Sequence, residues 1–75
     1  MKQKIWLLTW DDDFSTVAFE KLEDAKEYAL SQLRRDITGE EDYQTVVKEL
    51  NESYDEYKGF FVEGWLWCNA IELYK

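Results

Sequence analysis

The sequence predicts a single α+β domain in which two helices pack on one face of a small antiparallel sheet of three strands, or four if the last segment divides. Three observations support this fold. The chain has 75 residues, near the lower size limit for a core without disulfides or metals, so that residues 1–75 form one domain. Strand-like segments stand at both ends of the chain, and two stretches of helical periodicity lie between them. The expected order is therefore β-β-α-α-β.

The N-terminal part predicts a hairpin. Residues 4–10, KIWLLTW, are apolar and rich in strand formers, and residues 14–19, FSTVAF, make a second strand-like run. Three consecutive aspartates, residues 11–13, separate the two runs, and aspartate accepts the backbone geometry of turns. We therefore interpret the triple aspartate as the connection of the hairpin.

A calcium loop is the alternative interpretation of the three aspartates. Such a loop needs a glycine at its sixth position and a bidentate acid at its twelfth. Counted from Asp11, these positions hold Thr16 and Leu22. The spacing favours a solvated turn without a metal ion.

Two consecutive helices are predicted next, over residues 22–37 and 40–57. Acids stand early and bases late in the first helix, which matches its dipole. Thr38, followed by Glu41, fits a capping box and predicts a tight break between the helices at Thr38 and Gly39. Tyr57 continues the apolar stripe of the second helix. The residues expected to pack on the sheet are Leu22, Ala25, Ala29, Leu33, Tyr43, Val46, Val47, Leu50 and Tyr54.

The C-terminal residues 60–74, FFVEGWLWCNAIELY, predict either one long strand or two strands joined near Glu63 and Gly64. Because two helices cover only one face of a small sheet, some tryptophans are expected on the open face, where they anchor interfaces well. Alternatively, the rings fold over and bury each other. The tryptophans concerned are Trp6, Trp10, Trp65 and Trp67.

The composition argues against an enzyme. The chain has no histidine, which is the commonest general base and zinc ligand. Cys68 therefore has no histidine to activate it, and it is most simply a buried apolar residue. The sequence also has no glycine-rich phosphate loop and no basic aromatic strip for nucleic acid. An enzyme with paired carboxylates remains an alternative that would require a concave acidic pocket. We expect no catalytic residues, no cofactor and no metal.

The cysteine content also bears on location. A single cysteine excludes a disulfide within the chain, which favours a reducing compartment. The apolar run before Asp11 is too short for a signal peptide or a membrane span. We therefore expect a cytoplasmic protein that binds no membrane, in the host cytoplasm if the protein is phage-encoded.

The charge pattern carries the functional prediction. Nine basic and 17 acidic residues give a net charge of −8, which repels nucleic acid and attracts basic surfaces. Residues 40–57 hold seven acids and one base, and so carry −6 of this charge. Several of these acids are like-charge neighbours at helical spacing, and two lie where the helix dipole disfavours them. A segment that breaks such rules is a candidate for function, although a solvated acidic face that aids solubility is an equal alternative.

The outward acids of the predicted second helix form a row about 22 Å long, which is comparable with several successive phosphates of one DNA strand. Together with the triple aspartate, the row predicts a surface that enters a lysine- and arginine-lined groove meant for nucleic acid. The predicted partner-binding residues are Asp11, Asp12, Asp13, Glu41, Glu49, Glu52, Asp55 and Glu56.

The layout of a short hairpin, VAFEKLEDAKEYA leading into a helix, an acidic second helix and an aromatic C-terminal strand resembles small acidic phage-encoded proteins of the anti-CRISPR and DNA-mimic class. The resemblance covers the whole chain in size, charge and layout, and it carries over no functional residues. It implies a protein that blocks a host defence nuclease.

Two functions are therefore expected. The first is a non-enzymatic inhibitor that binds a basic, nucleic-acid-binding surface of another protein. The alternative is a small acidic interaction module without nucleic-acid mimicry, such as an immunity protein, an antitoxin or an assembly adaptor. Phosphate mimicry predicts a steep loss of affinity with salt, which separates the two.

Overall fold

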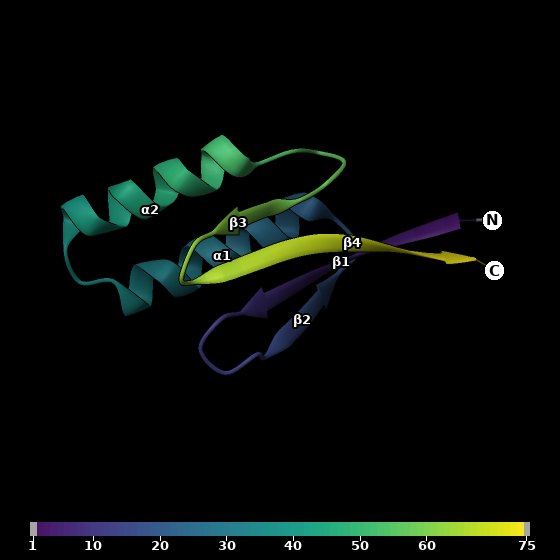
Figure 1. Ribbon diagram of the computed structural model, residues 1–75, viewed down its shortest axis with the longest axis horizontal. Helices are drawn as coiled ribbons and strands as arrows, with labels where there is room; N and C mark the ends of the chain where they lie inside the picture. Colours follow the sequence, from purple (N-terminus) through teal and green to yellow (C-terminus); the bar gives the residue numbers. More distant parts are fainter. Residues whose placement is uncertain (1, 75) are drawn as a thin grey trace.

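Four strands form one antiparallel sheet in the order β2-β1-β4-β3, and two helices cover one of its faces (Figure 1). The structure is a computed structural model that describes residues 2–74, with the side chains of residues 4–72. Its elements are β1 (Lys2–Trp10), β2 (Thr16–Phe19), α1 (Leu22–Asp36), α2 (Glu40–Ser53), β3 (Phe60–Val62) and β4 (Leu66–Tyr74). The α+β fold is confirmed, and the C-terminal segment divides into two strands, which makes the order β-β-α-α-β-β.

The core lies between the sheet and the two helices. α1 packs against β1 and β2, whereas α2 packs mainly against β3. Alternate residues of each strand point toward the helices, as the period of a strand requires. The strand residues buried there are Trp6, Leu8, Phe60, Val62, Leu66 and Cys68. Full burial of a leucine such as Leu8 contributes about 1.5–3 kcal/mol.

The predicted helix positions in the core are largely confirmed. Buried helix residues are Leu22, Ala25, Ala29, Leu33, Val46 and Leu50. Tyr43 and Tyr54 are partly buried against the same core. Val47 is half-buried and stands outside the core cluster. The helical period of the sequence therefore identified the inward faces of both helices.

The predicted end of the second helix is wrong, because α2 stops at Ser53. Tyr54 has an extended backbone, with φ −62° and ψ 125°. The next residues form a turn in which Asp55 Oδ1 accepts hydrogen bonds from the backbone N–H groups of Tyr57 (2.8 Å) and Lys58 (3.0 Å). An aspartate side chain that bonds nearby backbone groups competes with the helix for them. Tyr57 is consequently 72% exposed and takes no part in the apolar stripe.

A glycine completes this turn. Gly59 has φ +108°, a conformation that side-chain-bearing residues rarely adopt, and a Cβ built on it would lie 2.0 Å from the carbonyl oxygen of Cys68. Gly59 also exchanges two backbone hydrogen bonds with Asp55. The chain thereby reverses and enters β3 beside β4.

The break between the helices also differs from the prediction. The N-cap of α2 is Gly39, and no side chain caps the helix. A capping box of Thr38 and Glu41 is therefore absent. Three acids, Glu40, Glu41 and Asp42, occupy the first turn of α2, where the positive end of the dipole favours them.

Candidate protein-binding surface

The eight predicted binding residues lie in three separate places. Residues 11–13 form the tip of the β1–β2 hairpin. Glu41, Glu49 and Glu52 lie exposed on α2. Asp55 and Glu56 belong to the turn after α2, which lies across the molecule from the β1–β2 hairpin tip (Figure 1). The fold therefore does not join these residues into one row.

The shortening of α2 also changes its charge. Five acids and one base, Lys48, remain within Glu40–Ser53, which gives −4 instead of the −6 expected for residues 40–57. Of the like-charge neighbours at helical spacing, only Glu49 and Glu52 still share the helix. The row from Glu41 to Glu52 is about 17 Å long. α2 therefore contains fewer unfavourable charge contacts than the sequence predicted.

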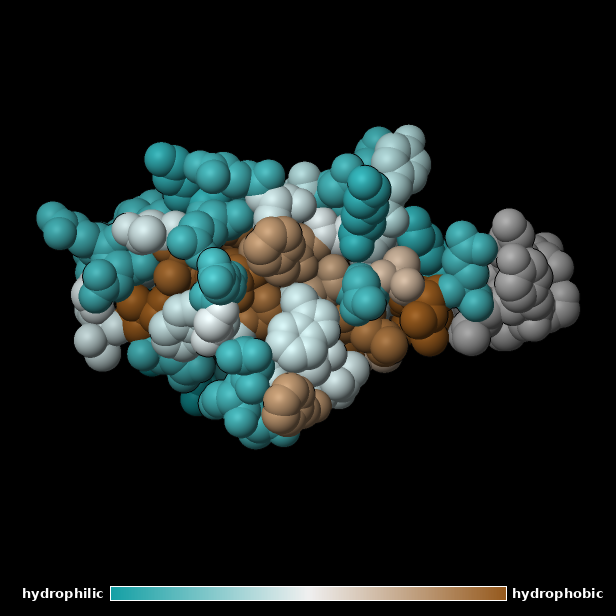
Figure 2. Space-filling model, in the orientation of Figure 1, coloured by the Kyte–Doolittle hydropathy of each residue, from teal (hydrophilic) through white to brown (hydrophobic). Residues whose placement is uncertain are grey.

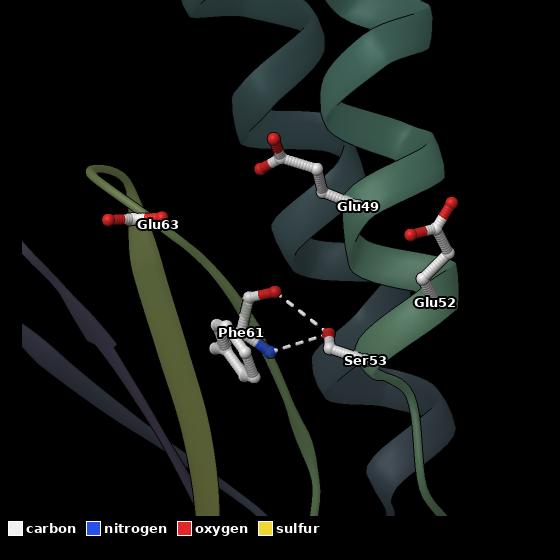
Figure 3. A pocket seen from close by; sticks show the side chains of 5 residues that line it. All are labelled: Glu49, Glu52, Ser53, Phe61 and Glu63. Carbon is white, nitrogen blue, oxygen red and sulfur yellow. Dashed lines mark hydrogen bonds between the residues drawn. The ribbon is translucent and has the colours of Figure 1, made fainter.

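A shallow groove between α2 and β3 gathers acids from two elements (Figure 3). It has a volume of about 380 Å³ and is lined by Glu49, Glu52, Ser53, Phe61 and Glu63. We call it the α2–β3 groove. Glu63 comes from the turn between β3 and β4 and was missed by the sequence analysis. Only the fold brings it near α2, so that no local sequence signal marks it.

Ser53 fixes the geometry of the groove. Its hydroxyl oxygen accepts a hydrogen bond from the backbone N–H of Phe61 at 2.9 Å and lies 2.8 Å from the carbonyl oxygen of the same residue (Figure 3). The hydroxyl oxygen of Ser53 also lies 2.9 Å from the carbonyl oxygen of Leu50, which is a second acceptor for its hydrogen. The last turn of α2 is thereby tied to β3. The serine also occupies the free edge of this strand, which would otherwise offer unpaired groups to another chain.

The acids of α2 are only partly neutralised. Arg34 forms an ion pair with Glu40 at 2.7 Å, and hydrogen bonding from Gln44, with the charge and hydrogen bond of Arg34, lowers the pKa of Glu40. Lys48 Nζ lies 3.8 Å from Glu52 Oε1. Because both side chains are largely exposed, this ion pair contributes little to stability. Within the described residues, no base pairs with Glu49. The groove therefore keeps an excess of negative charge.

The triple aspartate is a hairpin connection, as predicted. Asp12 Oδ1 accepts a hydrogen bond from the N–H of Asp13, and Asp13 Oδ1 accepts one from the N–H of Ser15 at 3.0 Å. The latter bond lowers the pKa of Asp13. Asp11 N–H donates to the carbonyl oxygen of Trp65 at 2.8 Å, which joins the two hairpins. Nowhere in the described part of the chain do three His, Cys, Asp or Glu side chains form a group able to hold a metal ion.

The predicted second strand begins later than the sequence indicated, at Thr16 instead of Phe14. Phe14 has φ +57°, and its N–H donates to the carbonyl oxygen of Trp10, while Trp10 N–H donates to that of Ser15. This is the pattern of a bulge in which glycine usually holds the positive-φ position. Phe14 therefore lies in the connection, and 69% of the residue is exposed.

The four tryptophans are divided between the two sides of the sheet. Trp6 is buried, and Trp10 and Trp65 are partly buried against the core. Trp67 lies on the open face, as expected for some of the four, and is 36% exposed. Trp10 and Trp65 also line a hollow of about 130 Å³ with Asp12, Asp36 and Gly64, at the end of the molecule where the two hairpins meet.

Cys68 is buried, and burial raises the pKa of its thiol to about 11. It therefore stays protonated at neutral pH, and a thiol is a much weaker nucleophile than a thiolate. Cys68 acts as an apolar core residue.

Comparison with protein-family models, curated proteins and solved structures found no match to this chain. Among the described residues, no helix is long and apolar enough to cross a membrane.

Proposed function

We propose that the protein is a non-enzymatic inhibitor that binds a basic, nucleic-acid-binding surface of another protein, in the manner of anti-CRISPR and DNA-mimic proteins. The observation that carries the proposal is the α2–β3 groove, where Glu49, Glu52 and Glu63 stand exposed around Phe61. A concave surface with three carboxylates and one neighbouring lysine, Lys48, attracts a lysine or arginine side chain. The net charge of −8 extends this attraction over a longer range.

The described side chains do not include the histidine or the reactive thiol on which most acyl-transfer enzymes depend. The chain has no histidine, and Cys68 is buried with a raised pKa. The α2–β3 groove contains carboxylates, but it is a shallow surface that does not enclose a substrate. Binding is therefore the function that this geometry supports best.

An affinity experiment tests the proposal. The immobilised protein is incubated with a bacterial lysate depleted of nucleic acid, and bound proteins are eluted with increasing salt and identified by mass spectrometry. We expect a nucleic-acid-binding protein that elutes at moderate salt and is displaced by duplex DNA. If duplex DNA displaced none of the recovered proteins, nucleic-acid mimicry would be contradicted. The alternative of a general interaction module would then be favoured.

A matched pair of variants locates the binding charge. Glu49→Gln, Glu52→Gln and Glu63→Gln together should weaken binding of the recovered protein at least tenfold, about 1.4 kcal/mol, mainly through slower association. The control is Glu20→Gln, Glu23→Gln and Glu27→Gln, three exposed acids outside the groove. Both variants lose three negative charges, so that equal weakening would show a general effect of net charge and no role for the groove.

A further inference from the structure

One face of the sheet is left uncovered by the helices, and its composition differs from that of the rest of the surface. Strand register and alternation place nine described positions on this open face: Ile5, Leu7, Thr9, Thr16, Ala18, Phe61, Trp67, Asn69 and Ile71. None of these nine is charged, although charged residues make up 35% of the chain. A sheet face that only meets water normally carries polar and charged side chains.

Three large apolar side chains on the open face are exposed, and two of them, Trp67 and Phe61, are neighbours on adjacent strands. Phe61 is 59% exposed, Ile71 42% and Trp67 36%. Thr9, Trp67 and Phe61 lie opposite one another on adjacent strands, and Phe14 contacts Trp67 edge to face with ring centroids 6.4 Å apart. Hydrophobic surface gathers along the middle of this side of the molecule, over the strands (Figure 2). Single exposed apolar residues are ordinary, but a contiguous patch marks an interaction site.

Phe14 adds an independent observation. It holds a positive-φ position of the hairpin where glycine would fit without strain, and a bulky residue there is uncommon. The ring gains little burial in exchange, since 69% of the residue remains exposed. A strained residue that contributes little to the core is a candidate for function. At this position, the strain places an aromatic ring beside Trp67 at the edge of the open face.

The size of the open face limits what binds it. Four strands about 4.8 Å apart, each contributing up to five residues of about 3.4 Å, give an area of roughly 320 Å². A stable interface buries about 800 Å² on each partner, so the open face alone is too small. Neighbouring surface must contribute, and that surface is acidic. Residues 11–13 adjoin Phe14, and Glu49, Glu52 and Glu63 adjoin Phe61 in the α2–β3 groove.

This charge distribution selects the occupant. A second copy of the chain, with net charge −8, would bring two acidic borders together, which like-charge repulsion opposes. A partner with basic side chains around an apolar spot matches both the centre and the border. We propose that the open face is the apolar centre of the binding surface and that its occupant is a different protein whose apolar spot is surrounded by lysine and arginine. This inference rests on the proposed function, since it assumes a basic partner. It adds that the apolar contact with this partner is made by the open face of the sheet.

Two helical peptides that imitate such a partner test the inference. One carries leucine on one face and lysine on the other, and the second has alanine in place of every leucine, with the same lysines. Nuclear magnetic resonance titration at low salt gives the affinity and the affected residues. We expect the leucine peptide to bind at least about tenfold more tightly. It should shift the indole signal of Trp67 and the amide signals of Phe14 and Phe61.

Variants of the open face should remove this preference. Phe14→Gly and Trp67→Thr should each bring the two peptides close to equal affinity, whereas Tyr57→Ser, a change of an exposed aromatic in the turn after α2, should preserve the preference. Phe14→Gly relieves a strained position, so a folded variant remains available if Trp67→Thr does not fold. Amide spectra verify the fold of each variant.

The other outcomes are informative in different ways. Equal affinity of the two peptides, with shifts confined to α2, would overturn the inference and leave the proposed function in place. Failure of both peptides to bind would contradict the proposed function as well. Self-association in sedimentation that Trp67→Thr abolishes would show that a second copy occupies the open face, and this also would overturn the inference.

Discussion

The two faces of the sheet are built from the same strands, and often from adjacent residues. Trp6 and Leu8 of β1 are buried under the helices, while Leu7 between them points to the open face. Phe60 is 3% exposed, and its neighbour Phe61 is 59% exposed. Both faces are largely apolar, yet only one is covered.

Folding accounts for the covered face alone. Its apolar residues gain burial against α1 and α2, which stabilises the domain. The apolar residues of the open face gain much less within the monomer. Their composition therefore points to contacts outside the chain. Substitutions on the covered face should mainly lower stability, whereas substitutions on the open face should mainly weaken binding.

The largest expected effect on stability belongs to the covered side. Leu50 of α2 is fully buried, so that Leu50→Ala should destabilise the domain by roughly 2–5 kcal/mol, which is a large share of the total. Ile71→Ala on the open face, at 42% exposure, should cost about 1 kcal/mol or less. Urea unfolding measures both. A loss below about 0.5 kcal/mol for Leu50→Ala would show that the inward face of α2 is wrongly assigned.

A smaller effect is expected where the covered side meets the edge of the sheet. Ser53→Ala removes the hydroxyl that pairs with the N–H and C=O of Phe61, and it should cost about 0.5–1.5 kcal/mol. The same change opens the edge of β3, so that association at high protein concentration should increase. Ser31→Ala on the exposed surface of α1 is the control. Light scattering that rises equally in both variants would contradict the role of Ser53 at this edge.

The residues of α2 show how far the sequence alone predicts this structure. Val46 and Leu50 follow the helical period, and this period identified the covered face. The same period continues through Tyr54 to Tyr57, but the side chain of Asp55 bonds the backbone and starts a turn. A periodic pattern cannot report that competition, because it depends on where β3 must begin.

The candidate site was less predictable than the fold, for two physical reasons. Glu63 joins Glu49 and Glu52 only because β3 packs beside α2, which is a tertiary contact. Phe14 was expected to begin a strand, because a bulky residue seldom takes a positive φ and no local pattern predicts that it will. The prediction that some tryptophans lie on the open face is met by Trp67, but the sequence did not single out Trp67 among the four.

Acid should destabilise the fold at the turn that follows α2. Hydrogen bonds from the N–H groups of Tyr57 and Lys58 hold the pKa of Asp55 below its usual 3.8. A carboxyl whose pKa is lowered by folding stabilises the folded state above its unfolded-state pKa. That contribution disappears as the pH falls through the folded-state pKa. Thermal unfolding between about pH 5 and about pH 2 should therefore show a smaller acid-induced loss in Asp55→Asn than in wild type.

The control for this prediction is Tyr57→Ser, which keeps the carboxyl of Asp55 and the backbone N–H groups that bond it, and which should therefore retain the acid dependence of wild type. Identical acid dependence in wild type and Asp55→Asn would mean that the charge of Asp55 does not stabilise the turn.

The smallest expected change in stability is also the sharpest contrast between the two sides of the sheet. Phe14→Gly relieves a positive-φ conformation that costs about 1–3 kcal/mol. Against this gain stand the lost contact with Trp67, about 0.5–1.5 kcal/mol, and the greater freedom of glycine in the unfolded chain, about 0.4–1 kcal/mol. These terms nearly cancel, so that the free energy of unfolding should change by less than about 1 kcal/mol in either direction. Phe60→Ala under the helices should instead cost roughly 3–5 kcal/mol. A loss of several kcal/mol in Phe14→Gly would show that Phe14 stabilises the fold. Folding alone would then explain the position of its ring, without a binding partner.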